Sequence, residues 1–175
     1  MTARGHCEVE WLASRLAAEG EDNDDVDGPS SDAVINGQLA LVDCRPSSEF
    51  GSIHIVGAVS LSLPTLIQRR LLKGNLATPA ALGYCSANDR GSKVTEAQWK
   101  STMIVLYDES TTTSQLARAA AAAAATEDGA NICMTSKMLA VLLENLRKDG
   151  YKACLLQGLI KTFIKQQARI LRMLA

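Results

Sequence analysis

This chain of 175 residues lacks long apolar runs and has no marked surplus of charge of either sign. No uninterrupted apolar segment reaches the length of about 18 to 20 residues that crosses a bilayer, so we expect no membrane span. The first ten residues lack an apolar stretch, which argues against a secretory signal. The net charge is −1, from 18 basic and 19 acidic side chains, and this argues against a nucleic-acid partner. A cytosolic or nuclear protein is expected.

Cysteines and histidines are few and dispersed. The cysteines number five, and no two form a C-x-x-C pair, so we expect neither a disulfide framework nor a zinc site. Cys44 and Cys154 lie in apolar runs and are predicted to be small core residues. Glycine-rich phosphate loops and the H-E-x-x-H motif are missing, and there are only two histidines. We therefore expect no metal and no cofactor.

Two segments have low sequence complexity. Between Glu21 and Asp32 there are six acids and no base, and we predict a flexible acidic loop over residues 20–36. Seven consecutive alanines, from Ala119 to Ala125, follow a run of threonines and indicate a surface insertion over residues 110–132. The length that remains is suited to one folded domain.

The ordered segments alternate in type. Helices are predicted where apolar residues recur at helical spacing, and strands where short apolar runs are bounded by turn residues. The expected helices are 9–18, a second from the cap Ser62 to Lys73, and a third from Thr135 or Ser136 to Gly150; the expected strands are 39–44, 57–61, 102–107 and 153–156. Buried strands alternating with helices predict an α/β domain, with a mostly parallel central sheet and helices on both faces.

The loop after strand 102–107 is the place where a catalytic anion-binding loop would be expected. Two carboxylates that would repel phosphate or thiosulfate stand in it, in the run Asp108-Glu109-Ser110. No cysteine is followed by the x-x-G-x-x-R pattern of such a loop. Asp43 and His54 could form an acid–base couple, although such a pair more often makes a structural hydrogen bond. We therefore do not expect an enzyme.

The second predicted helix carries an unusual basic run, Gln68-Arg69-Arg70-Leu71-Leu72-Lys73. On an ideal helical wheel, Arg70 falls among Leu63, Leu66 and Ile67, while Arg69 lies outside that cluster. A helix that only fills a core does not place an arginine in its apolar stripe. Either the Arg70 side chain extends outward at the helix end, or part of this apolar face is exposed and meets a partner with an acidic patch.

Several motifs, taken in order, resemble a known family. The opening runs L-V-D-C-R-P at 41–46 and S-I-H-I at 52–55 are similar to a rhodanese-like domain. More narrowly, R-R-L-L-K-G-N-L at 69–76 and V-L-Y-D-E-S at 105–110 resemble the N-terminal domain of dual-specificity MAP kinase phosphatases, closest to the cytoplasmic subgroup that acts on ERK-class kinases. The likeness covers residues 9–158, interrupted by the acidic loop and the alanine insertion.

This resemblance implies a rhodanese-like fold without catalysis that binds a MAP kinase, most of all one of the ERK class. The arginine pair would be the kinase-interaction motif and would meet an acidic docking groove on the kinase. By position, the docking residues would be Leu66, Ile67, Arg69, Arg70, Leu71, Leu72 and Lys73. The run Asp108-Glu109-Ser110 would be the degenerate active-site loop. The resemblance also implies a cytoplasmic protein that regulates MAP kinase signalling.

Two features depart from that family. Its members continue into a phosphatase domain with an H-C-x-x-G-x-x-R loop, and this sequence contains no such motif, so we expect a form without that domain. Residues 159–175 carry four bases and no acid, which predicts a basic amphipathic tail or an end changed by truncation or splicing. Two alternatives stay open: a scaffold module without kinase selectivity, and a sulfurtransferase. The sequence does not indicate an oligomeric state.

Overall fold

The computed structural model describes residues 6–18, 39–86, 95–109, 111–112, 114–115, 117–118, 134–157 and 163. Its strands are β1 (His6–Glu8), β2 (Leu39–Asp43), β3 (Ala58–Leu61), β4 (Cys85–Ser86), β5 (Met103–Tyr107) and β6 (Lys152–Gln157). Its helices are α1 (Val9–Ala18), α2 (Ser47–Ser52), α3 (Thr65–Leu72), α4 (Thr78–Leu82), α5 (Glu96–Ser101) and α7 (Met134–Lys148). Helices and strands alternate along the chain, as the sequence predicts.

The strands form one sheet in the order β1-β6-β5-β2-β3-β4. The pairings from β1 to β3 are all parallel, and the short edge strand β4 is antiparallel to β3. At the carboxyl end of the central strand β2, Asp43 is aligned with Ser60 of β3 and with Tyr107 of β5. The ends of three strands therefore meet at one edge, and the α/β class with a mostly parallel sheet is confirmed.

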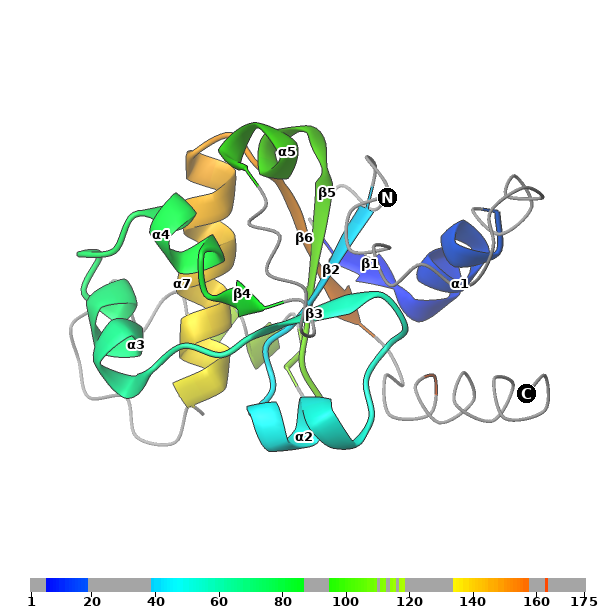
Figure 1. Ribbon diagram of the computed structural model, residues 1–175, viewed down its shortest axis with the longest axis horizontal. Coiled ribbons are helices and arrows are strands. Elements are labelled where there is room, and N and C mark those ends of the chain that lie inside the picture. Colours follow the sequence, from blue (N-terminus) through cyan, green and yellow to red (C-terminus); the bar gives the residue numbers. More distant parts are fainter. Residues whose placement is uncertain are drawn as a thin grey trace.

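Helices cover both faces of the sheet (Figure 1). One face packs against α3, α4, α5 and α7, and its core contains Val42, Leu106, Leu139 and Leu142. The other face packs against α1 and α2, and its core contains Leu12, Phe50 and Val105. Alternate residues of β2 and β5 enter the two cores, which explains why these strands read as continuous apolar runs.

The apolar stripe predicted for the last long helix is confirmed. Its five large side chains are all buried in α7, namely Met138, Leu139, Leu142, Leu143 and Leu146. Gly150, at a φ of 82°, lies just after the end of α7, and Gly74, at a φ of 69°, lies just after the end of α3, where each turns the chain out of the helix. Both glycines adopt the left-handed backbone that other residues enter only with strain.

The predicted cap of α3 is wrong. The helix begins at Thr65, its N-cap is Pro64, and no side chain makes a capping hydrogen bond there. The residue before a proline is sterically kept out of the helical region, so Ser62 and Leu63 stay outside the helix. The buried side chain of Leu63 instead joins the core of the face that α3 covers.

Five short elements were not predicted, because none of them shows the apolar run or the helical periodicity by which the others were recognised: β1, α2, α4, β4 and α5. One of them has a recognisable sequence signal. In α5, Thr95 and Gln98 form a capping box, in which each side chain bonds the backbone N–H of the other residue. A helix start at Thr95 could therefore have been predicted from the T-x-x-Q spacing.

Three predicted segments lie wholly or mostly outside the described residues. The acidic loop 20–36 is outside them entirely, and only six residues of the insertion 110–132 are within them. Of the tail 159–175, only Phe163 is described, and it is half-buried against the core that contains Leu12 and Phe50. Among the described helices, none is both long enough and apolar enough to cross a bilayer.

Replacing Gly150 with alanine should lower the free energy of unfolding by about 1 kcal/mol, because a Cβ is strained at a φ of 82°. Gly51 is the matched control. It lies inside α2, and an added Cβ there meets no atom within 4 Å. Gly51→Ala should be neutral or slightly stabilising, since alanine favours helix. Urea denaturation of both variants is the measurement, and equal effects of the two changes would contradict the assigned turn.

Candidate functional site

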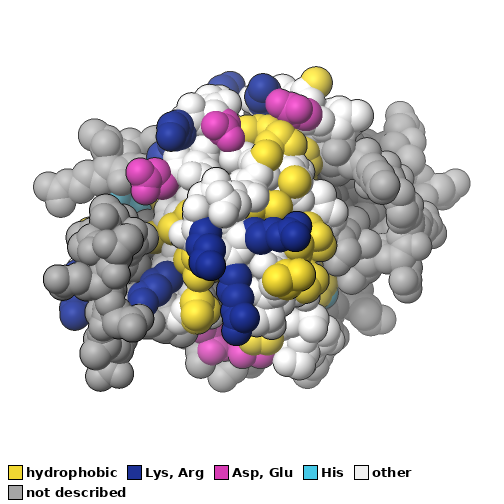
Figure 2. Space-filling model, turned by 90° about the vertical axis from the view of Figure 1, so that its left-hand side faces the viewer, with side chains coloured by type: hydrophobic (Ala, Val, Ile, Leu, Met, Phe, Trp, Pro, Cys, Tyr) yellow, Lys and Arg dark blue, Asp and Glu magenta, His cyan; other side chains and the backbone are white. Residues whose placement is uncertain are grey.

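Helix α3 presents an exposed row of four side chains, which we call the α3 stripe. It consists of Leu66, Arg69, Arg70 and Lys73, at the spacing i, i+3, i+4 and i+7 that shares one helix face. Leu66 is the most exposed large hydrophobic residue among the described ones, at 63%. Figure 2 shows basic side chains gathered among hydrophobic ones on the side of the molecule formed by α3, α4 and α7. An apolar anchor and three cations are thus available to a partner.

The opposite face of α3 belongs to the core. Leu71 is fully buried, and Ile67 packs partly buried against the same cluster, where α3 lies against α7. The side-chain amide of Gln68 donates to the carbonyl oxygen of Leu63 at 2.7 Å and fixes the helix start. The backbone N–H of Asn75 donates to the carbonyl oxygen of Arg70 at 2.8 Å and fixes the helix end. The α3 stripe is therefore held on a helix anchored at both ends.

One of the expected docking residues is buried. Leu71 has no exposed surface and packs in the core beneath α3. Ile67 and Leu72 are half-buried at the margins. Both features named by the two alternatives for the basic run are present: Arg70 is exposed in the last turn of α3, and Leu66, one turn before it, leaves part of the apolar face exposed. Leu63 and Ile67 turn toward the core.

The three cations of the α3 stripe are not neutralised within the described part of the chain. None of Arg69, Arg70 and Lys73 takes part in the ion pairs found there, which involve Arg45, Lys100 and His6. A cation without a local partner keeps its field available to an incoming acidic surface. The stripe is also near the C-terminus of α3, where cations are favoured by the helix dipole.

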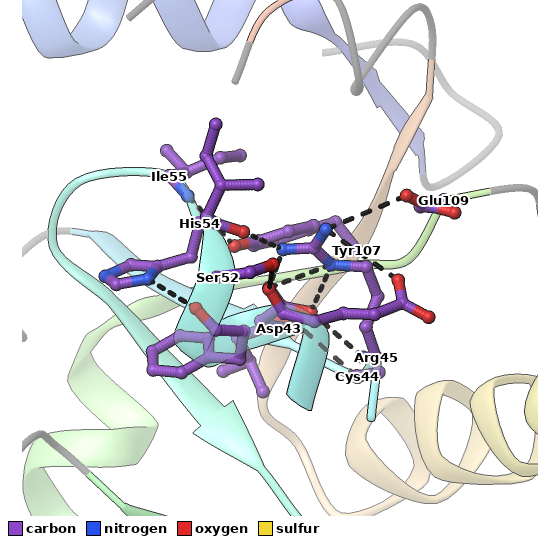
Figure 3. A network of polar contacts seen from close by, with 12 residues as sticks. Asp43, Cys44, Arg45, Ser52, His54, Ile55, Tyr107 and Glu109 are labelled. Carbon is purple, nitrogen blue, oxygen red and sulfur yellow. Dashed lines mark hydrogen bonds and ion pairs between the residues drawn. The ribbon is translucent and has the colours of Figure 1, made fainter. Parts of the chain in front are cut away.

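A buried ion pair organises the carboxyl end of β2 (Figure 3). Arg45 is 4% exposed and Asp43 is fully buried. The Arg45 Nη2 atom lies 2.6 Å from Asp43 Oδ2, its Nε donates to Asp43 Oδ1 at 3.0 Å, and its backbone N–H donates to the same oxygen at 2.9 Å. Both the backbone and the side chain of Arg45 therefore bind the carboxylate of the residue two positions before it.

The Arg45 guanidinium also ties together the segments around it. Its Nη2 donates to the carbonyl oxygen of Ile53 at 2.8 Å, and its Nη1 lies 4.0 Å from Glu49 and 3.9 Å from Glu109. Its carbon Cζ lies 5.8 Å from the ring centre of Tyr107. Burial acts to lower the pKa of Arg45, but the hydrogen bonds and charge of Asp43 outweigh it and raise that pKa. Arg45 thus stays charged and structural.

The possible acid–base couple of Asp43 and His54 is not formed. Asp43 is engaged by Arg45, and the His54 Nδ1 atom donates instead to the carbonyl oxygen of Phe50 at 2.8 Å. The rings of Phe50 and His54 are stacked with their centres 4.1 Å apart. Asp43 and His54 therefore each have a structural partner of their own and do not act as a couple.

In the loop after β5, where a catalytic anion-binding loop would be expected, the carboxylate of Asp108 holds the loop together from within. Asp108 is buried, and its carboxylate accepts hydrogen bonds from the backbone N–H of Thr111, at 2.7 Å, and from the Thr111 hydroxyl. The Ser136 hydroxyl, in the first turn of α7, lies 2.9 Å from the Thr111 hydroxyl. Ser110 is outside the described residues. Among the described residues of this loop, the backbone N–H and hydroxyl of Thr111 are thus already engaged by Asp108.

No reactive thiol stands near this loop in the described chain. The nearest candidate along the sheet is Cys44, whose backbone N–H donates to the carbonyl oxygen of Tyr107 at 2.9 Å. Its side chain points into the core, and burial raises the pKa of this thiol well above its ordinary value. The described residues also contain no group of three or more side chains arranged to hold a metal ion.

Comparison with known proteins agrees with this geometry. The family model for the rhodanese-like domain matches residues 30–136. The chain belongs to the rhodanese-like domain family. This membership fits the sheet order and the helices on both faces.

Similar proteins include several dual-specificity phosphatases. The chain is 32% identical to dual specificity protein phosphatase 7 of Homo sapiens over 150 residues, which are 86% of this chain and 28% of that protein. It is 31% identical to dual specificity protein phosphatase 6 of Rattus norvegicus over 123 residues, 70% of this chain and 27% of that protein. It is 27% identical to dual specificity protein phosphatase Mpk3 of Drosophila melanogaster over 157 residues, 90% of this chain and 32% of that protein.

The resemblance to the rhodanese-like domain of dual-specificity phosphatases is thereby confirmed. The match covers only part of these relatives, since the chain spans only about three tenths of their length. The shared part is the rhodanese-like region, within which the described residues hold the α3 stripe and the loop closed by Asp108. The network around Arg45 was not foreseen from the sequence, although D-x-R at a strand end was a usable signal.

Because α3 has a buried and an exposed face, replacing a leucine with alanine should have a large effect on stability on one face and a small effect on the other. Leu71→Ala removes a fully buried side chain and should lower the free energy of unfolding by about 2 to 5 kcal/mol. Leu66→Ala, on the same helix, should change it by less than about 0.5 kcal/mol, because Leu66 is 63% exposed. Urea titrations followed by circular dichroism distinguish the two, and a large loss for Leu66→Ala would contradict the exposed stripe.

Removing the Asp43 charge should be strongly destabilising. Asp43→Asn leaves the buried Arg45 guanidinium without its nearest anion, at a cost of about 3 kcal/mol. The matched control is Glu96→Gln, which breaks the exposed pair of Glu96 with Lys100 and should have no measurable effect. Thermal and urea unfolding measure both changes. Similar stabilities for Asp43→Asn and the parent protein would show that the pair is not a structural requirement.

Proposed function

We propose that this chain is a non-catalytic docking domain that binds a MAP kinase through the α3 stripe. One observation supports this most: an exposed leucine and three cations without ion partners in the described chain share one face of a helix whose other face is anchored in the core. An exposed leucine adds little to the internal stability of a folded domain, so its place beside three cations suits an external partner.

The chemistry of the stripe defines the partner surface. Arg69 and Arg70 can each make bidentate contacts with carboxylates, and Lys73 adds a third positive charge at the helix end. Leu66 would enter an apolar pocket beside those carboxylates, with the half-buried Ile67 and Leu72 at its margin. An acidic groove next to a hydrophobic pocket on a kinase surface is complementary to this arrangement.

The choice of kinase is supported by the family resemblance. The motif R-R-L-L-K-G-N-L at 69–76 resembles that of MAP kinase phosphatases that act on ERK-class kinases, so an ERK-class kinase in the cytoplasm is the proposed partner. In a protein that also carries a phosphatase domain, docking raises the effective concentration of that domain near its substrate. Where this domain acts alone, the same contact sequesters the kinase or competes with other docking proteins.

The test is calorimetric titration of the chain with ERK-class and stress-activated MAP kinases. Arg69→Ala/Arg70→Ala should weaken binding to the preferred kinase roughly 10- to 100-fold, as expected when paired arginines lie at the centre of an interface. Lys148→Ala/Lys152→Ala is the matched control, because it removes two exposed cations from α7 and β6, outside the stripe.

The possible results are distinct. Selective binding that depends on the arginine pair and not on the control pair supports docking through the stripe. Equal losses for both double variants would indicate general charge attraction, and equal affinity for all kinases would favour a scaffold without selectivity. Unchanged affinity of Arg69→Ala/Arg70→Ala would overturn the assignment of the stripe.

A further inference from the structure

Two cysteines that are distant in the sequence meet at the edge of the sheet opposite β4. Cys7 lies in β1, and Cys154 lies in β6, which is the one neighbour of β1 among the described strands. Their Sγ atoms are 3.0 Å apart, and both residues are buried. They lie in the same core as Leu12 of α1, on the face of the sheet away from α3. Neither thiol is used by the proposed docking function.

The two thiols are not equivalent. The Cys7 Sγ atom is within hydrogen-bonding reach of Cys154 Sγ and also of the carbonyl oxygen of Leu155, at 3.7 Å. The hydrogen bond between the two sulfurs lowers the pKa of Cys154, while burial acts in the opposite direction and the charge of Arg147 lowers this pKa further. The same hydrogen bond, together with burial, raises the pKa of Cys7. We therefore take Cys154 as the thiol that reacts first and Cys7 as the resolving thiol.

We propose that Cys7 and Cys154 are a redox-active thiol pair that forms a reversible disulfide between β1 and β6 when a hydroperoxide oxidises it. The Cys154 thiolate attacks the terminal oxygen of the hydroperoxide, the O–O bond breaks, and the leaving oxygen takes a proton. The Cys7 sulfur then attacks the sulfenic sulfur of Cys154 and displaces hydroxide, which takes the Cys7 proton and leaves as water. With hydrogen peroxide, two thiols give one disulfide and two waters.

The edge position makes the required movement feasible. A disulfide needs its sulfurs about 2.05 Å apart, so they must approach each other by about 1 Å. Cys7 is aligned with Leu156, two residues beyond Cys154, so β1 must also shift along β6. Strand β1 has three residues and is held in the sheet by β6 alone, so local opening of this edge gives the oxidant access and allows the shift.

Formation of the bond would fix α1 to the sheet. Helix α1 follows β1 directly, so a link between β1 and β6 secures the start of that helix as well. The α3 stripe is on the other face, and kinase binding should therefore be the same in the reduced and oxidised forms. The inference does not depend on the proposed docking function, and its failure would leave that function untouched.

The direct test uses the full chain without substitution. The folded protein is treated with hydrogen peroxide, alkylated under denaturing conditions, digested and mapped by mass spectrometry. We expect a peptide pair linked through Cys7 and Cys154, with two of the five thiols lost and restored by dithiothreitol. The proposal is overturned if Cys7 and Cys154 remain alkylatable, become linked to other cysteines, or are oxidised separately without a link.

A second measurement identifies the roles of the two sulfurs. Oxidation should raise the melting temperature of the parent protein by about 5 °C or more, because a disulfide that closes a long loop stabilises the fold. Cys7→Ser should abolish that rise and leave a sulfenic acid on Cys154 that dimedone traps. Cys85→Ser is the control and should keep both the linked peptide and the rise in melting temperature. No rise in the parent, or a persisting rise in Cys7→Ser, would contradict the proposal.

Discussion

The ion pair of Asp43 with Arg45 connects the parts of this domain that meet at the carboxyl ends of the strands. Asp43 ends the central strand β2, between β3 and β5, and its carboxylate is fully buried there. Burial of that charge is tolerable only because Arg45 folds back onto it and also bonds the carbonyl oxygen of Ile53. The segment between β2 and β3 is held in place through this arginine, and Glu109 after β5 approaches the same guanidinium.

This arrangement has an electrostatic consequence. In an anion-binding loop at the strand ends, a cation and backbone N–H groups would be free to hold the anion. Here the buried cation Arg45 is shared among Asp43, Glu49 and Glu109, so positive potential at this edge is cancelled. The cations without ion partners among the described residues include those of the α3 stripe, so uncompensated positive charge lies on α3 and not at the strand ends.

Most of the fold could be predicted from the sequence, because the central helix and strands show a clear hydrophobic pattern along their whole length. The stripe of α7 and the apolar runs of β2 and β5 can be buried in only one way, and their prediction did not depend on tertiary detail. Helix α3 is different, since it has eight residues with apolar side chains on most sides. Which of Leu66 and Leu71 faces inward depends on the position of α7, and an isolated helical wheel does not contain that information. The contact of Cys7 with Cys154 spans 147 residues and was invisible for the same reason.

The docking residues are a prediction from a family resemblance, and the packing of α3 limits which of them a partner could reach. Leu71 is buried and anchors the helix, whereas Leu66 is exposed, so the proposed docking would use one face of α3 and the stability of the domain the other. A surface held on a packed helix loses little conformational freedom on binding, which is the main physical advantage of a folded docking domain over a flexible basic peptide. The loop held by Asp108 also contributes to the stability of this side of the domain. Its carboxylate accepts hydrogen bonds from the backbone N–H and hydroxyl of Thr111, and that hydroxyl lies within hydrogen-bond distance of Ser136. This loop therefore supports α7, the helix on which α3 rests.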